Sequence, residues 1–128
     1  MGHPTIYPTG VTVYNPEKCW NGFTIFQALE VGAVLMNMNG RENKVWKGVH
    51  GFPNKIFPGG YLMTSRGSRD GRYGVQDGLD LVQIDWDGNV VWKFDRNEYI
   101  EDPGIPGRWM ARSHHDYQRE GSTTGYYA

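Results

Sequence analysis

The chain has 128 residues, which is enough for one modest domain and too few for two independent cores. Its formal net charge of −1 excludes the basic surface that nucleic-acid binding requires, and no apolar run approaches the roughly 18 residues of a membrane span. Five Trp and eight Tyr supply apolar area in a chain with only five Leu, so we expect a folded, aromatic-rich protein.

The N-terminal region, residues 5–30, is predicted to contribute a strand segment. The residues before it, Met1–Pro4, lack the basic and apolar regions of a secretory signal. The single cysteine, Cys19, excludes an intrachain disulfide and a cysteine-based zinc cluster. Both observations favour a cytoplasmic location, although a removed signal would leave the same sequence.

Strands are expected throughout, because the chain has only four Ala among 18 Gly and 7 Pro. A first hairpin is predicted over residues 34–47. Val34, Met36 and Met38 share one parity, and Asn39-Gly40 forms the turn. The next three residues, 41–43, are expected to lengthen its loop.

A second hairpin is predicted over residues 82–94. Val82, Ile84 and Trp86 alternate with polar residues, and the same alternation returns after Asp87-Gly88. An Asp-Gly pair between alternating segments is typical of a two-residue type I′ turn. We interpret Trp46, Trp86 and Trp92 as packing residues.

The two hairpins resemble each other. Val34–Gly40 aligns with Val82–Gly88 at an offset of 48, and Val45–Lys47 aligns with Val91–Lys93 at an offset of 46. The difference predicts loops that differ by two residues. In addition, His50 and His115 are each followed ten residues later by Gly-Tyr.

Repeats of 40–50 residues built only of strands indicate β-propeller blades. We therefore predict an all-β chain of two to three blades in a single domain, 1–128, with repeat units at about 31–65 and 79–127. Residues 95–113 contain Pro103-Gly104 and Pro106-Gly107 and are expected to form a long loop.

Seven short segments carry a more specific resemblance. They are Pro8–Gly10, Cys19–Gly22, His50–Lys55, Val82–Gly88, Val91–Lys93, Trp109–Arg112 and His114–Asp116. Together they resemble the N-terminal part of the propeller in the aryl-sulfate sulfotransferase family. The most specific element is the His-His-Asp motif that follows an arginine.

The resemblance implies a six-bladed propeller that moves a sulfuryl group from a phenolic sulfate ester to a phenolic acceptor. It also implies a sulfohistidine intermediate and no nucleotide or other cofactor. At about 40–45 residues a blade, six blades need roughly 250 residues. We therefore expect either a longer chain, or identical copies that complete the ring, such as three copies of two blades.

His115 is the predicted catalytic residue, with Arg112 and His114 as substrate-binding neighbours. Sulfuryl transfer needs a cation or donor on the sulfonate oxygens, and a neutral imidazole can act as nucleophile or general acid. From the resemblance, we assign His115 to sulfuryl binding first and to nucleophilic attack second. The alternative is that both imidazoles bond to loop carbonyls and only cap a strand.

Three further residues are candidates for substrate binding. His50 occupies the position equivalent to His115 in the preceding repeat, where a structural hydrogen bond is an equal alternative. Arg108 and Trp109 could stack on a phenolic ring, while packing of Trp109 between blades is the favoured alternative.

The loop over residues 65–80 contains Arg66, Arg69 and Arg72, which could bind an anionic ester. Three aspartates in the same loop nearly neutralise them, so we favour a solvated loop. No metal site is predicted, because neighbouring side chains in the motif at 114–116 point to opposite faces of a strand.

A function from a different class remains open. The repeated hairpins could form a non-catalytic structural or binding module that self-assembles through its exposed strand edges. The first function predicts turnover of an aryl sulfate, and the second predicts none. We expect no nucleic-acid or membrane partner.

Overall fold

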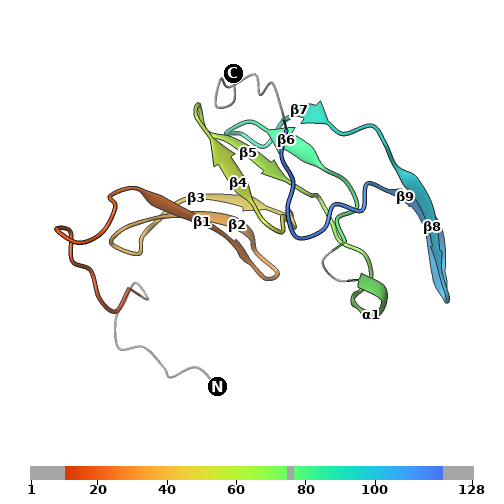
Figure 1. Ribbon diagram of the computed structural model, residues 1–128, viewed down its shortest axis with the longest axis horizontal. Helices are drawn as coiled ribbons and strands as arrows, with labels where there is room; N and C mark the ends of the chain where they lie inside the picture. The colour runs from red at the N-terminus through yellow and green to blue at the C-terminus, as the bar shows by residue number, and fades with distance from the viewer. Residues whose placement is uncertain (1–10, 75–76, 120–128) are drawn as a thin grey trace.

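The computed structural model describes residues 11–74 and 77–119. Strands dominate these residues, with one four-residue helix, α1 (Gly71–Gly74), and all strand pairs are antiparallel (Figure 1). The all-β prediction is confirmed. Within the described part of the chain, no helix has the length and apolar character needed to cross a membrane.

Three sheets contain the strands. The first has the order β1 (Phe23–Ala28), β2 (Gly32–Asn37), β3 (Glu42–Lys47). The second has the order β4 (Lys55–Phe57), β5 (Tyr61–Thr64), β6 (Val82–Ile84), β7 (Val90–Lys93). The third is the pair β8 (Glu98–Asp102) and β9 (Ile105–Met110).

Both predicted hairpins are present, as β2–β3 and β6–β7. Their turns close by hydrogen bonds from Gly40 N–H to the Asn37 carbonyl (2.9 Å) and from Gly88 N–H to the Asp85 carbonyl (3.1 Å). Each glycine has a positive φ, +75° and +92°, but the residue before it does not. The turns are therefore of type I followed by a glycine bulge, and the type I′ prediction for Asp87-Gly88 is wrong.

The reason for this turn type lies in the residue that opens it. Asn37 Oδ1 accepts hydrogen bonds from the N–H groups of Asn39 (3.0 Å) and Arg41 (3.1 Å). Asp85 Oδ1 makes the same two bonds in the second hairpin. A side chain that satisfies the backbone two residues ahead stabilises a type I geometry.

The two hairpins also have loops of equal length, so the predicted difference of two residues is wrong. The register shift follows Leu35 in the first hairpin and Gln83 in the second, which are 48 residues apart. Trp46 therefore matches Phe94, and not Trp92. Trp46 is buried, whereas Trp92 is only partly covered.

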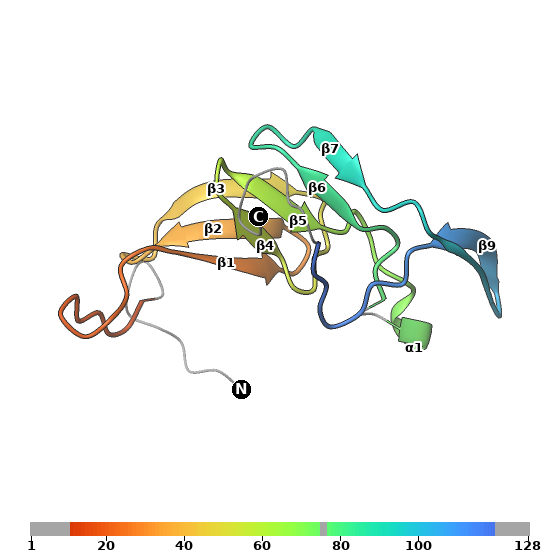
Figure 2. The same cartoon turned by 45° about the horizontal axis from the view of Figure 1, so that its top comes forward.

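The core lies where the first two sheets pack on each other (Figure 2). The first sheet contributes Ala33, Leu35 and Trp46, the second contributes Leu62, Val82 and Ile84, and Val49 joins them from the connection between β3 and β4. Trp86 is 41% exposed but meets Trp46 edge-on, with ring centroids 5.3 Å apart. These apolar contacts hold the two sheets together.

The two sheets pack front to back, so that one face of the first sheet meets the opposite face of the second. By the register, Leu35 is equivalent to Gln83, and Val34 is equivalent to Val82. In the first sheet the Leu35 face is in the core, whereas in the second sheet the Val82 face is in the core. Opposite faces of two equivalent sheets therefore meet, which leaves the Val34 face of the first sheet without a neighbouring sheet among the described residues.

Residues 95–113 do not form the predicted long loop. They form the β8–β9 hairpin, which extends away from the two packed sheets (Figure 1). Pro103 and Gly104 make its turn, with the glycine at φ +76°, because proline presets the first central position and glycine accepts a positive φ at the second. Trp109 is 67% exposed on this hairpin and packs edge-on against Tyr99, so its predicted burial between blades is wrong.

After β9 the chain returns to the second sheet. The Lys55 amine donates to the Tyr117 carbonyl and pairs with Asp116, both at 2.6 Å. The Tyr117 hydroxyl has the carbonyl oxygens of Pro53 and Met63 as acceptors for its one proton, and burial raises the pKa of this phenol. This return brings residues 112–116 beside the loop at 65–80.

Candidate functional site

Asp77 lies at the centre of the charged cluster in this region. Its carboxylate is 11% exposed and lies 2.6 Å from His114, measured from Oδ1 to Nδ1. Its second oxygen accepts from Arg69 Nη1 at 3.1 Å. Burial opposes ionisation of this group, but the bonds from His114 and Arg69 outweigh it and lower the pKa of Asp77.

Arg69 connects this carboxylate to a second one. Its Nε and Nη2 donate to the two oxygens of Asp102 at 2.9 and 2.5 Å, which is a bidentate pair between the loop and the end of β8. The bond to Asp102, followed by the bond to Asp77, raises the pKa of Arg69. The guanidinium also lowers the pKa of Asp102. Arg69 is therefore a structural cation that ties the β8–β9 hairpin to the loop.

Arg112 approaches the same cluster from the segment after β9. Its Nε lies 3.9 Å from Asp77 Oδ2, and its Nη1 donates to Glu98 at 2.9 Å. Its Nη2 has no partner among the described residues, and the Arg112 side chain is 44% exposed. Arg112 can therefore contact an anion while Asp77 and Glu98 hold its position.

The backbone around His114 is strained. Arg112 has φ +52° and His115 has φ +60°, and only one other non-glycine residue in the described ranges, Glu30, has a positive φ. The left-handed region costs an L-residue about 1–2 kcal/mol. Strain of this kind is concentrated at functional sites. The two adjacent imidazoles therefore lie in a segment whose backbone is strained on either side of His114.

Those two imidazoles lie next to each other, with ring centroids 4.2 Å apart. His115 is exposed and also meets Phe52 edge-on at 5.8 Å. The alternative in which both rings bond to loop carbonyls is wrong for His114, whose Nδ1 bonds to the Asp77 carboxylate. An ionised carboxylate only accepts, so Nδ1 carries the proton, and in the neutral ring Nε2 keeps a free lone pair.

The other predicted binding residues lie elsewhere. His50 is exposed in the connection between β3 and β4, and its imidazole has no hydrogen bond or ring contact with a described residue. Arg108 lies opposite Ile100 in the β8–β9 hairpin, where its charge acts on Asp70 and Asp102. The structure brings together Arg112, His114 and His115, but not His50, Arg108 or Trp109.

In the predicted solvated loop at 65–80, the side chains of Arg66 and Arg72 are 48% and 65% exposed and that of Arg69 is 17% exposed, and all three are bound in ion pairs. Arg66 Nε donates to Asp80 at 2.8 Å, and Asp80 is buried. Arg72 pairs with Asp70, and this bond lowers the pKa of that carboxyl to about 2. The loop aspartates therefore neutralise the arginines, as expected, through specific ion pairs.

Sequence reasoning missed Asp77, Arg69 and Asp102 as partners of the histidine motif. The available signal was the near balance of arginines and aspartates over residues 65–80, which indicates pairing but not its partners. The bonds span 37 residues for His114–Asp77 and 33 for Arg69–Asp102. No local pattern specifies contacts at that separation.

The described residues contain no group of three or more side chains able to hold a metal ion. The chain matches no protein-family model, no curated protein and no solved structure. An imidazole oriented by a buried carboxylate, beside a second imidazole and an arginine, can act as a nucleophile or a base toward an anionic substrate.

Proposed function

We propose that the chain forms two blades of a propeller that transfers a sulfuryl group between phenols, with the reacting group at His114, His115 and Arg112. The observation that carries the proposal is the bond between Asp77 and His114. A carboxylate that holds one imidazole nitrogen leaves the other free for attack, as in other nucleophile–base–carboxylate arrangements.

The stacking of the sheets supports the propeller part of the proposal. Propeller blades are equivalent antiparallel sheets around a channel, and each packs one face on the opposite face of its neighbour. The β1–β3 and β4–β7 sheets have equivalent hairpins and pack front to back. Further blades, from a longer chain or from other copies, would continue the same contact.

In this proposal the nucleophile is His114 in preference to His115. Its Nε2 attacks the sulfur of the aryl sulfate, the S–N bond forms, and the bond from sulfur to the phenolic oxygen breaks. The donor phenolate leaves with the electron pair. The acceptor oxygen then attacks the sulfur, the S–N bond breaks, and the acceptor's proton passes to the released phenolate.

The neighbours have separate roles. Asp77 stabilises the imidazole as it gains positive charge. The free donors of Arg112 and the exposed ring of His115 bind the sulfonate oxygens, which carry the charge that shifts during transfer. Phe52, beside His115, offers a ring edge to a phenolic group.

The test is transfer from 4-nitrophenyl sulfate to phenol by the full chain, followed as release of 4-nitrophenolate. We expect turnover that His114→Gln abolishes and His115→Gln lowers, with an intermediate heavier by one sulfuryl group in intact mass spectra. His50→Gln is the matched control and keeps full turnover. No turnover in any oligomeric form of the chain would refute the proposal.

A second function, self-assembly without catalysis, is favoured by a separate observation. Among the residues that the structure describes, no sheet packs on the Val34 face of the first sheet, and Phe26 on that face is 39% exposed. At the edge strand β7, Val90 and Val91 are 42% and 50% exposed. If the same front-to-back packing continues, the open face is covered by a sheet from a second copy of this chain.

Light scattering on a size-exclusion column tests the assembly. A mass of three times 14.6 kDa, independent of concentration, would support a closed ring of two-blade chains. A mass that grows with concentration, and that Val91→Lys reduces, would support open assembly through strand edges. A concentration-independent monomer would exclude both.

A further inference from the structure

The segment at residues 116–119, here called the strap, lies on the face of the β4–β7 sheet that points away from the first sheet. Side chains from the four strands form a row on this face, since each is the register partner of the next: Lys55, Met63, Gln83 and Trp92. The core residues of these strands have the opposite parity. The strap and the first sheet therefore cover opposite faces of the second sheet.

The strap is bound at both ends of this row. At one end, the Lys55 amine donates to the Tyr117 carbonyl and lies 5.4 Å from the centroid of the Tyr117 ring. At the other end, Arg119 Nη1 donates to Gln83 Oε1 at 2.8 Å, and the guanidinium lies 4.4 Å from the centroid of the Trp92 ring. The strap therefore crosses from β4 to β7.

The strap does not satisfy every polar group of the face that it covers. Met63 and Gln83, in the middle of the row, are fully buried. Arg119 binds the oxygen of the Gln83 amide, but Nε2 of this amide has no hydrogen-bond partner among the described residues. A buried donor without an acceptor is unfavourable, so an occupant that offers an acceptor would cover this face better.

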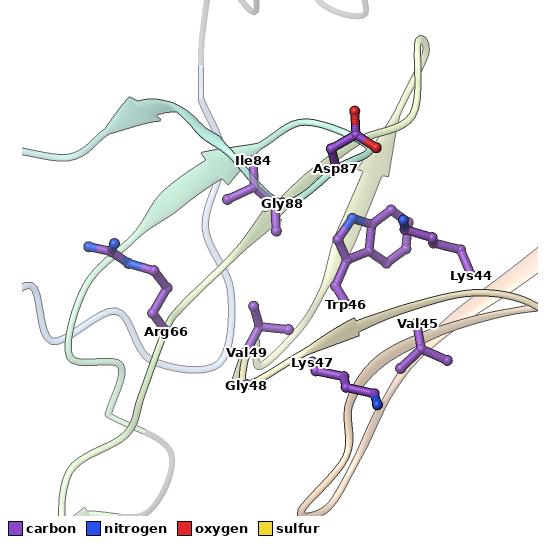
Figure 3. Close-up of a pocket in the computed structure, with 10 residues that line it drawn as sticks. All are labelled: Lys44, Val45, Trp46, Lys47, Gly48, Val49, Arg66, Ile84, Asp87 and Gly88. Carbon is purple, nitrogen blue, oxygen red and sulfur yellow. The ribbon is translucent and has the colours of Figure 1, made fainter.

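In the first sheet, the equivalent row is covered by a neighbouring sheet. Leu35 is equivalent to Gln83, and it is buried in the core between the two sheets. In the same row, the Lys44 amine lies 5.2 Å from the ring centroid of Trp86, in the β6–β7 turn. Figure 3 shows Lys44 and Trp46 of β3 next to this turn. A sheet thus packs on this row in one blade, and the strap lies on it in the other.

We propose that the strap occupies the place of the next blade, and that a second copy of this chain displaces the strap when it docks its Val34 face there. The inference rests on the propeller of the proposed function and adds a control on its assembly. The strap and the second copy compete for one surface, so the strap weakens association of the chains.

The Val34 face has an apolar groove for this contact. The groove has a volume of about 390 Å³, and most of its lining is apolar: Phe26, Ala28, Val31, Val34 and Met36. Phe26 and Val31 are partly exposed in the described part of the chain. Removal of the strap would uncover Met63 and Trp92, so two apolar surfaces could then be buried against each other.

The test compares self-association of the full chain and of two strap variants by sedimentation velocity. Arg119→Ala removes the bond to Gln83 and the contact with Trp92, and we expect association to tighten by about tenfold. Tyr117→Phe removes only the hydroxyl that bonds to two carbonyls, so a smaller increase is expected. Arg96→Ala removes the same charge at an exposed position outside the strap and should change nothing.

Two further measurements test the surface and the displacement. Phe26→Glu places a charge in the groove of the Val34 face, so it should cancel the increase caused by Arg119→Ala. A carbodiimide condenses the Lys55 amine and the Asp116 carboxylate, 2.6 Å apart, into an amide with loss of water. We expect the cross-linked peptide in the monomer, and its depletion in the oligomer.

Three results would overturn the proposal: equal association of the parent and both strap variants, an increase that survives Phe26→Glu, or an oligomer that keeps the cross-link between residues 55 and 116. A parent that forms a closed ring unaffected by the strap variants would refute the strap and leave the propeller intact. Release of 4-nitrophenolate by the same samples tests sulfuryl transfer separately.

Discussion

His114 and Asp77, 37 residues apart in the chain, meet at 2.6 Å between Nδ1 and Oδ1. The contact joins the segment after β9 to the end of the loop at 65–80, where the Asp77 side chain is almost completely buried. It fixes which nitrogen of the imidazole carries the proton.

Asp77→Asn should reverse the tautomer of His114. An amide NH₂ in place of the carboxylate donates to Nδ1, so the proton moves to Nε2 and the nucleophilic lone pair is lost. We expect sulfuryl transfer to fall by about 10²–10⁴-fold, mainly in kcat. Nitrogen NMR of the imidazole would report the tautomer directly. Asp95→Asn, at an exposed position after β7, is the control and should change neither the rate of sulfuryl transfer nor the imidazole NMR spectrum.

Glycine should be better tolerated than alanine at position 115. The native φ of +60° is unfavourable for alanine but not for glycine, so His115→Gly should be more stable than His115→Ala by about 1 kcal/mol. Chemical denaturation of the two variants measures the difference. At position 50, where φ is not positive, the order should reverse. The same order at both positions would show that His115 is not strained.

Acid should weaken the link between the loop and the β8–β9 hairpin. The bonds from Arg69 lower the pKa of Asp102, so this carboxylate binds a proton less readily in the folded chain than in the unfolded one. Its contribution to stability is therefore complete above the unfolded value of about 3.9 and is lost as the pH falls through the lower folded value.

The variant Asp102→Asn should therefore be less stable than the parent at pH 7, and the two should converge as the pH falls below about 4. Urea midpoints measured from pH 7 to pH 2 would show the convergence. Asp95→Asn serves again as the control. A constant gap between Asp102→Asn and the parent across this range would contradict the pairing with Arg69.

Gly32 should not accept a side chain. Its φ is +133°, and a Cβ at this position would collide with the backbone carbonyl of Trp46 on the paired strand β3. Gly32→Ala should therefore cost at least about 2 kcal/mol of stability. Gly22→Ala is the matched control, since a Cβ there meets no atom within 4 Å, and it should cost less than about 0.5 kcal/mol. Thermal melting of both variants makes the comparison.

The hairpins could be predicted because their signals are local. Asn39-Gly40 and Asp87-Gly88 lie between alternating apolar residues, and the glycine supplies the positive φ that each turn needs. The turn type could not be read from the glycine pair alone, because Asn37 and Asp85 decide it through their side-chain hydrogen bonds. The same bonds give the loops equal length.

The β8–β9 hairpin could not be predicted from the sequence because of its prolines. Two Pro-Gly pairs are typical of a loop, but Pro103-Gly104 forms the turn and Pro106 lies within β9 of a two-stranded sheet. An edge strand tolerates proline because an N–H that faces solvent has no ladder bond to lose. Composition cannot distinguish an edge strand of this kind from a loop.

The sequence by itself determined the all-β class, the two equivalent hairpins and a histidine motif beside an arginine, because these depend on residues that are neighbours along the chain. Only the tertiary structure decided which histidine is held by a carboxylate and that Arg69 is bound by Asp77 and Asp102. Those features depend on how sheets and loops meet across more than 30 residues of sequence. Coulombic and packing energies select that arrangement, and they act through space and not along the chain.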